Sequence, residues 1–361
     1  MEVFFVRTIA FFNNKGGVGK TTIATTIGYE LSRKGKKVLM IDLDPQSNTT
    51  QVVLNDAQVE RIYKKSSNID RIKTIKDVYN PMRDSNEPEI GNVKESILSG
   101  EKHGFKFDIL PSNLNLSEFE DTLSDAWSDL RANKLGGFRR TNWFIQLEQQ
   151  IKSDYDYVLL DLSPSLGALN RSVLLNVDFF IIPITGDIYN VYGIQNIGRW
   201  ISQWIRTYTR SLSYLKDDYD AETLNRSQIN LSLKQENFKK FAGYIVSRAK
   251  YSKKTSGIIS YQKKHISDIK KMIHESLYFA TVDNIELTSL ELGEIREIMS
   301  LLTESQGAHV PSYKRVAEAE QNHKKWDKGS AQNAEYAIMK TFDQITTNLL
   351  INIGDKNDTN N

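Results

Sequence analysis

Six short apolar runs alternate along the chain with longer segments in which apolar residues recur every three or four positions. Short apolar runs are typical of buried strands in a parallel sheet, and the longer period is typical of helices packed on a sheet. The runs that predict strands are Val6–Phe12, Lys37–Asp42, Phe105–Leu110, Asp156–Asp161, Phe179–Ile184 and Phe241–Val246. The segments that predict helices are Lys20–Lys34, Thr74–Tyr79, Leu116–Leu130, Trp143–Ile151, Gly193–Tyr208, Ile258–Ile273 and Ala331–Leu350. This alternation predicts an α/β fold with a mostly parallel sheet.

Two polar stretches interrupt the pattern. Residues 55–104 contain Pro81, Pro88 and many charges, and residues 209–237 are also polar, so we interpret both as insertions. The remaining pattern predicts one domain over residues 1–354. The last residues, 355–361, are polar throughout and predict a disordered tail.

Between the first strand and the first helix lies the sequence Asn13-Asn14-Lys15-Gly16-Gly17-Val18-Gly19-Lys20-Thr21-Thr22. Glycines let successive backbone N–H groups turn toward an anion, and the start of a helix adds partial positive charge. We therefore predict a phosphate-binding loop formed by Asn14, Lys15, Gly16, Gly17, Val18, Gly19, Lys20, Thr21 and Thr22. Lys20 would bind the β- and γ-phosphates, and the hydroxyl of Thr21 would bind Mg²⁺.

Carboxylates follow two of the predicted strands. Asp42 and Asp44 lie at the end of the second strand, and Asp161 ends the fourth. Ligands of open α/β sheets bind at this end of the strands, where a carboxylate can hold a water or a metal-bound water. We expect Asp44 and Asp161 to join Thr21 in the metal site, Asp161 through the Thr21 hydroxyl or a water of the metal. Asp42 is expected to be structural.

The run Lys15–Thr22, with a lysine at its start, resembles the deviant Walker A motif of the ParA/MinD ATPases. The sequence Asp42-Leu43-Asp44-Pro45-Gln46 resembles the second motif of that family, and Pro164–Gly167 matches part of a third. Near the C-terminus, Val310–Ala319 resembles a fourth, with Ser312 and Tyr313 replacing the Arg-Asn of the family.

The resemblance implies a twisted sheet flanked by helices on both faces and slow hydrolysis of ATP with Mg²⁺. It implies that Lys15, Lys20 and Asp44 are catalytic, with Lys15 contacting the phosphates of a second subunit across an ATP-dependent homodimer. It also implies non-specific binding of double-stranded DNA by the ATP state, an activating adaptor protein, and a role in DNA partition or cargo positioning.

The amino-acid composition excludes several kinds of functional site. The chain has 361 residues, a formal net charge of +2 and no cysteine, so disulfides, thiolate metal sites and iron–sulfur clusters are excluded. This composition fits a cytoplasmic protein, nucleoid-associated if it binds DNA. No apolar run is long enough to span a membrane, and we expect no membrane partner.

Positive charge is concentrated in one part of the chain. From Arg199 to Lys271 there are 16 Lys/Arg against 6 Asp/Glu. Such a segment can neutralise DNA phosphates without reading sequence. The predicted DNA-binding residues are Arg248, Lys250, Lys253, Lys254, Lys263, Lys264, Lys270 and Lys271, with Arg315 added from the family motif.

Other functions remain open at this point. One is a nucleotide-controlled protein-interaction switch in a regulatory or defence operon, without cargo transport. A small-molecule kinase or synthetase with a related loop is another. The segment Leu349–Asp355 lacks the basic amphipathic character of a membrane-cycling ATPase.

Overall fold

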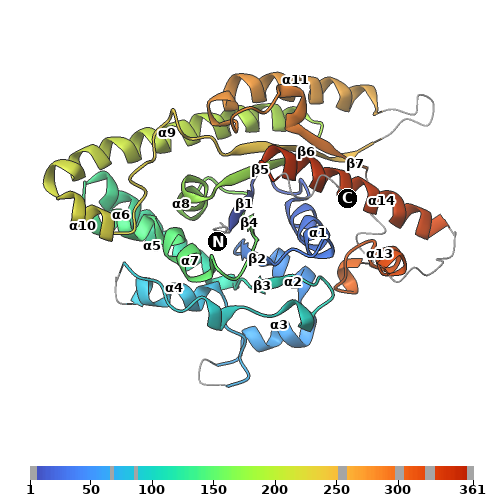
Figure 1. The fold of residues 1–361 in the computed structure, drawn as a ribbon, viewed down its shortest axis with the longest axis horizontal. Coiled ribbons are helices and arrows are strands. Elements are labelled where there is room, and N and C mark those ends of the chain that lie inside the picture. The colour runs from blue at the N-terminus through green and yellow to red at the C-terminus, as the bar shows by residue number, and fades with distance from the viewer. Residues whose placement is uncertain are drawn as a thin grey trace.

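The computed structural model describes residues 6–65, 69–84, 88–250, 258–296, 305–321 and 330–355. Within these ranges the strands form one parallel seven-stranded sheet, in the order β3-β2-β4-β1-β5-β6-β7 (Figure 1). The strands are β1 (Arg7–Phe11), β2 (Val38–Leu43), β3 (Asp108–Leu110), β4 (Tyr157–Leu162), β5 (Phe179–Ile184), β6 (Phe241–Ala249) and β7 (Glu291–Arg296). Every residue of β2 and β4 is buried, which explains their unbroken apolar sequences.

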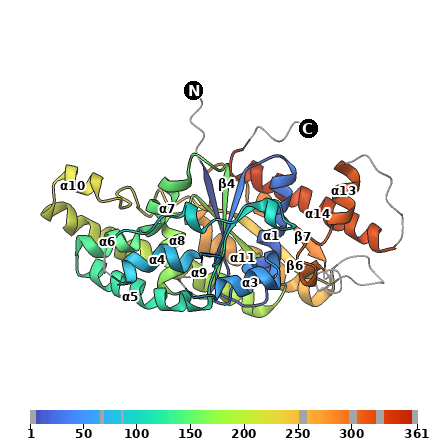
Figure 2. The ribbon, with the colours of Figure 1, turned by 90° about the horizontal axis from the view of Figure 1, so that it is seen from below.

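Helices cover both faces of the sheet, and each layer has its own apolar core. One layer contains α1 (Lys20–Arg33), α2 (Asn48–Val53), α3 (Asp56–Ile62), α13 (Lys314–Gln321) and α14 (Ser330–Asn352). The other contains α4 (Ile75–Asp84), α5 (Ser117–Arg131), α6 (Leu135–Thr141), α7 (Trp143–Ile151), α8 (Ala168–Asn176), α9 (Ile188–Asp218), α10 (Ala221–Arg226) and α11 (Ser260–Leu277). Figure 2 shows α10 at the opposite side of the molecule from α13 and α14. The expected α/β sheet with helices on both faces is confirmed.

All six predicted strands are present, with ends shifted by a few residues. The seventh strand, β7, was not predicted. Its sequence Glu-Leu-Gly-Glu-Ile-Arg has only two residues that become buried, Leu292 and Ile295. This pattern reflects an edge position, where β7 pairs with β6 alone and α14 packs against it.

Helix α9 is longer than predicted at both ends. Asp187 caps its N-terminus by accepting hydrogen bonds from the N–H groups of Tyr189 and Asn190, so the helix begins before Gly193. Its buried stripe continues through Leu212 and Leu215, so the first ten residues of the predicted 209–237 insertion belong to this helix.

Residues near the termini are also tied into the fold. The predicted disordered tail began at Asp355, but this carboxylate pairs with Arg7 at 3.3 Å and accepts a hydrogen bond from Tyr157. These contacts place Asp355 beside β1 and β4 and neutralise its charge. Residues 356–361 lie outside the described ranges.

Helix α5 contains five acidic residues, Glu118, Glu120, Asp121, Asp125 and Asp129. Three of them bind other elements: Glu118 pairs with Arg83, Asp129 pairs with Arg140, and Glu120 accepts hydrogen bonds from the first N–H groups of α8. The interaction of Glu120 matters most for the site, since α8 directly follows the segment after Asp161. An anion at this helix N-terminus stabilises α8.

Candidate functional site

The loop between β1 and α1 has the backbone of an anion-binding turn. Gly17 and Gly19 have φ values of 72° and 84°, a region that a residue with a side chain enters only at a cost. Gly19 is the N-cap of α1 and provides no side-chain cap. The first N–H groups of α1 are therefore directed toward the loop without a capping side chain, as in helices that bind phosphate.

Lys20 lies inside this loop. Only 8% of its surface is exposed, and its Nζ is 3.3 Å from the carbonyl oxygen of Asn13 and 3.4 Å from that of Lys15. Burial lowers the pKa of Lys20, and the nearby carboxylates of Asp161 and Asp44 oppose this effect. Two long hydrogen bonds hold the ammonium weakly, so phosphate oxygens can replace these carbonyls.

Asp161 of β4 connects the starts of helices α1 and α2. Its Oδ2 accepts hydrogen bonds from the hydroxyls of Thr21 at 2.6 Å and Thr49 at 2.7 Å. The expected contact with Thr21 is therefore present. Its Oδ1 is buried and has no hydrogen-bond partner in the described part of the chain. Burial raises the pKa of Asp161 to about 6, with hydrogen bonds from both threonines acting in the opposite direction.

Asp42, near the end of β2, and Asp44, just after it, have different surroundings. Asp42 is fully buried, accepts hydrogen bonds from the N–H and hydroxyl of Thr50, and pairs in register with Asp161. Burial, and after it the negative charge of Asp161, raises the pKa of Asp42 to about 8. Asp44 instead reaches the cavity wall, where Gln46 N–H and Asn48 Nδ2 orient its two oxygens at 2.9 and 3.1 Å. This contrast supports a structural role for Asp42.

A cavity of about 480 Å³ brings most of the predicted phosphate and metal residues together. Those that line it are Gly16, Gly17, Gly19, Lys20, Thr21, Thr22 and Asp44. The prediction missed other residues of its wall, among them Gln46, Asn48, Pro164 and Gln306. These residues belong to no periodic pattern of the sequence, so only the fold shows that they converge.

Three predicted loop residues do not line this cavity. The side chain of Val18 is in the core, while its carbonyl accepts a hydrogen bond of 2.6 Å from Ser247 of β6. Asn14 and Lys15 face a different cavity. The side chains of Asn14 and Lys15 therefore lie outside the cavity that Lys20 and Thr21 line.

Lys15 is held by the start of α9. Its Nζ is 2.6 Å from Oδ2 of Asp187, and it lies 5.8 Å from the ring centroid of Tyr189. Burial alone would raise the pKa of Asp187, but hydrogen bonds from Lys15 and Thr185 outweigh it and lower the pKa. This contact could not be predicted from the sequence, because an aspartate that precedes a helix is usually only its cap.

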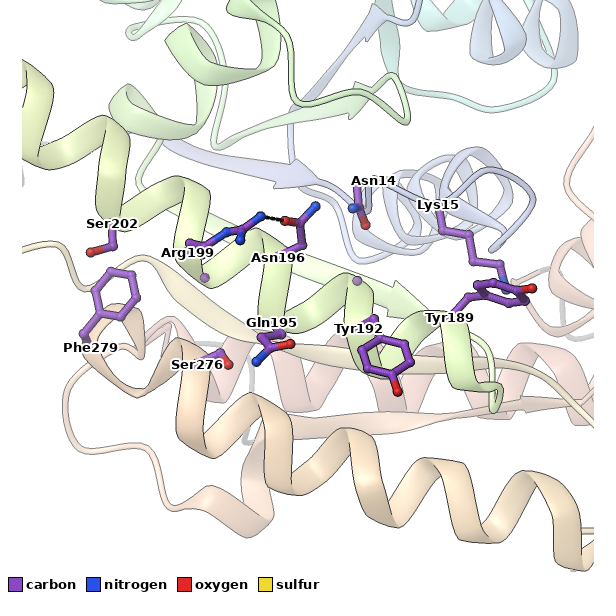
Figure 3. A pocket seen from close by; sticks show the side chains of 12 residues that line it. Asn14, Lys15, Tyr189, Tyr192, Gln195, Asn196, Arg199, Ser202, Ser276 and Phe279 are labelled. Atoms are coloured by element: carbon purple, nitrogen blue, oxygen red, sulfur yellow. Dashed lines mark hydrogen bonds between the residues drawn. The ribbon is translucent and has the colours of Figure 1, made fainter.

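An open groove of about 990 Å³ begins at Asn14 and Lys15 and follows one side of α9, and we call it the α9 groove. Figure 3 shows Tyr189 and Tyr192 near Lys15 and Arg199 farther along the helix. Tyr189 and Tyr192 are 74% and 63% exposed. Arg199 donates to Asn196 at 2.8 Å, and Oδ1 of Asn14 is buried with no hydrogen-bond partner in the described ranges. The groove is therefore polar and aromatic, with two cations.

The predicted DNA-binding residues do not form one cluster of equivalent side chains. Lys263, Lys264 and Lys271 are exposed on α11, whereas Lys270 pairs with Glu291 of β7 at 2.6 Å. Arg315 forms hydrogen bonds with Glu335 of α14. Arg248 lines the phosphate cavity. Lys250 is exposed after β6, and Lys253 and Lys254 lie outside the described residues.

The family model described as an AAA domain matches residues 6–214, more than half of the chain. The chain belongs to the ParA/MinD family of P-loop ATPases. Its curated relatives include an uncharacterised protein of Methanocaldococcus jannaschii, with 34% identity over 52% of this chain and 62% of the relative. Soj of Bacillus subtilis is 29% identical, over 53% of this chain and 63% of the relative. The chromosome-partitioning ATPase Soj of Thermus thermophilus is 28% identical, over 63% and 76%.

Solved structures extend the similarity of this ParA/MinD-family chain beyond residue 214. A protein from Corynebacterium diphtheriae has 30% identity and a TM-score of 0.67, covering 84% of this chain and 97% of its own. A putative plasmid partition protein of Borrelia burgdorferi, solved with AMPPNP, has 19% identity and a TM-score of 0.53, covering 96% and 99%. The latter likeness concerns the fold.

The chain spans less than two thirds of the length of the first curated relatives that it matches. Among the described helices, none combines the length and the apolar character that crossing a bilayer requires.

Proposed function

We propose that this chain is a Mg-ATP-dependent dimerising ATPase of ParA type, which binds duplex DNA non-specifically in its ATP state and acts in DNA partition or cargo positioning. The observation that supports it most is the arrangement of Lys20, Thr21 and Asp161 around the glycine loop. The buried Oδ1 of Asp161, without a hydrogen-bond partner among the described residues, fits a site whose charge is balanced by a cation.

When bound, Mg-ATP would supply the γ-phosphoryl group and the charge that polarises it. The helix N-terminus and Lys20 would bind phosphate oxygens, with Thr21 and Asp161 beside the metal. Asp44 would hold the attacking water, because its carboxylate faces the cavity and is oriented by Gln46 and Asn48. Asp44 would thus align the water, while Lys20 stabilises the charge that develops on the phosphate.

Two substitutions test these roles. Lys20→Ala should lose nucleotide binding, measured by isothermal titration calorimetry with ATP and Mg²⁺. Asp44→Ala should retain ATP but release no phosphate in a turnover assay. If both variants lose ATP binding equally, the role of Asp44 is structural rather than catalytic.

Dimerisation is supported by the position of Lys15 at the end of the α9 groove. Lys15 is turned away from the phosphate cavity of its own chain and is one third exposed. Exposed tyrosines beside a cation are typical of protein interfaces. We infer that a second copy covers this face when ATP is bound, which would bring Lys15 to the phosphates of the partner subunit.

The proposed DNA binding depends on fewer basic residues than the local charge of the sequence predicted. Lys263, Lys264 and Lys271 provide exposed cations on α11, and a two-fold dimer would present two such sets. Lysines act as point charges toward phosphates and give little base discrimination. An adaptor that stimulates hydrolysis and releases the DNA would complete the cycle.

The alternative is a nucleotide-controlled switch that binds a protein and no DNA. The pairing of Lys270 with Glu291 favours it, because this ion pair removes a cation from the predicted DNA surface. A gel-shift titration with ATP and any duplex at low salt decides between the two functions, since the switch predicts no complex.

A further inference from the structure

Arg248 is a cation whose location differs from that of the other basic residues. It is the only exposed residue of β6, and its side chain lines the cavity formed by the phosphate loop. Its guanidinium has no hydrogen-bond or ion-pair partner in the described part of the chain. An unpaired arginine in the wall of a polar cavity is suited to an anionic or aromatic ligand.

The backbone at Arg248 has an irregular conformation. Its φ value is 53°, which is costly for a residue other than glycine, and the pairing of β6 with β7 shifts register between Val246 and Ala249. Such irregularities re-aim side chains and are frequent beside functional sites.

Contacts on both sides hold this irregular segment in place. The hydroxyl of Ser247 donates to the carbonyls of Val18 at 2.6 Å and Ile184 at 3.1 Å, which attaches the end of β6 to the phosphate loop. Gln262 of α11 accepts from Lys250 N–H at 2.7 Å and donates to the Arg248 carbonyl at 3.2 Å. The position of Arg248 is therefore fixed relative to the loop.

The sheet order indicates which end of a nucleotide Arg248 would meet. In the order β2-β4-β1-β5-β6, Asp44 follows β2 and Asp161 ends β4, on one side of the loop that follows β1. Arg248 is on β6, on the other side. If the γ-phosphate faces the two aspartates, the adenosine end faces β6.

We propose that Arg248 binds the adenosine and α-phosphate end of the nucleotide, the part that ATP and ADP share. The inference rests on the proposed ATP site and adds a residue for affinity that the loop motif does not contain. A guanidinium can pair with the α-phosphate or stack on the base, so it contributes equally to ATP and ADP.

The test is calorimetric titration of the full chain with ATP, ADP and inorganic triphosphate. Arg248→Gln should weaken ATP and ADP binding alike, on the order of tenfold or more, as expected for loss of a charge-assisted contact. Triphosphate affinity should not change if Arg248 stacks on the base, and should fall as well if Arg248 pairs with the α-phosphate. Arg248→Gly, which suits the positive φ, should give the same loss, so backbone strain cannot explain it. Arg210→Gln on α9 is the matched control, because Arg210 is exposed and does not line the cavity.

Three results would overturn the inference. One is unchanged affinity for both nucleotides in Arg248→Gln and Arg248→Gly. Another is a loss confined to ATP, which would place Arg248 at the γ-phosphate. The third is a loss of DNA binding while nucleotide affinity is unchanged, which would show that Arg248 binds DNA, as the charge of the segment predicted. Absence of ATP binding by the unaltered chain would instead refute the proposed ATP site itself, together with this addition to it.

Discussion

The ammonium of Lys15 lies 2.6 Å from the carboxylate of Asp187, the residue that caps α9. This ion pair keeps Lys15 within its own subunit. For Lys15 to reach the phosphates of a partner, the pair must open, and its cost opposes dimerisation. Both side chains are partly exposed, at 33% and 24%, so this cost is small, roughly 0–1 kcal/mol.

The first prediction follows from that competition. Asp187→Asn keeps a capping side chain but removes the charge, and it should tighten the ATP-dependent dimer by about two- to fivefold. Analytical ultracentrifugation with ATP and Mg²⁺ measures the change. When Lys15 is already replaced by alanine, Asp187→Asn should not increase the affinity of the dimer. A weaker dimer in Asp187→Asn would mean that Asp187 supports the interface.

The second prediction concerns the loss of folding stability caused by the buried carboxylate of Asp161. The pKa of Asp161 is raised from 3.8 to about 6, so between these values the folded state binds the proton more tightly than the unfolded chain. The free energy of unfolding therefore falls as the pH rises through this range, and the loss persists above it. Asp161→Asn should raise the stability of the nucleotide-free protein at about pH 8 by roughly 1–3 kcal/mol.

The same variant should lose its response to the ligand. Thermal unfolding should show that Mg-ATP raises the Tm of the unaltered chain, while Asp161→Asn gains little. A nucleotide-free Asp161→Asn protein less stable than the unaltered chain would show that the carboxylate is needed for folding.

The third prediction concerns Glu120, which receives the first N–H groups of α8. Glu120→Ala should lower the free energy of unfolding by about 1–2 kcal/mol, the usual cost of losing a helix cap. Urea unfolding measures it, with exposed Asp125→Ala on the same helix as control. Equal stability of both variants would show that Glu120 does not stabilise the start of α8.

The apolar runs and the glycine loop predicted much of this fold and most of the phosphate site, because buried parallel strands and tight turns restrict sequence strongly. Strand β7 was not predicted, because only Leu292 and Ile295 of this edge strand are buried and two apolar residues do not form a recognisable run. Arg248 was predicted to bind DNA from its charge, whereas neither its place in the cavity wall nor the register shift beside it is visible in the sequence. The contact of Lys15 with Asp187 joins residues 172 positions apart, and local pattern cannot predict it.

The fourth prediction concerns DNA. Lys263→Glu with Lys264→Glu should abolish the ATP-dependent gel shift while leaving dimerisation intact. Arg206→Glu with Arg210→Glu, two exposed arginines of α9 outside the predicted set, is the charge-matched control. If the dimer neutralises about four phosphates, affinity should fall on the order of 100-fold between about 50 and 200 mM salt. A salt-independent complex would exclude binding through phosphates.

We propose above that ATP joins two copies of this chain, with Lys15 acting across the interface. Multi-angle light scattering of Asp44→Ala with ATP and Mg²⁺ tests it most directly, because this variant should hold ATP without consuming it. We predict a dimer with ATP, a monomer with ADP, and a monomer with ATP when Lys15→Ala is added. An Asp44→Ala protein that binds ATP yet stays monomeric at tens of micromolar, within the range of ordinary interface affinities, would contradict the claim.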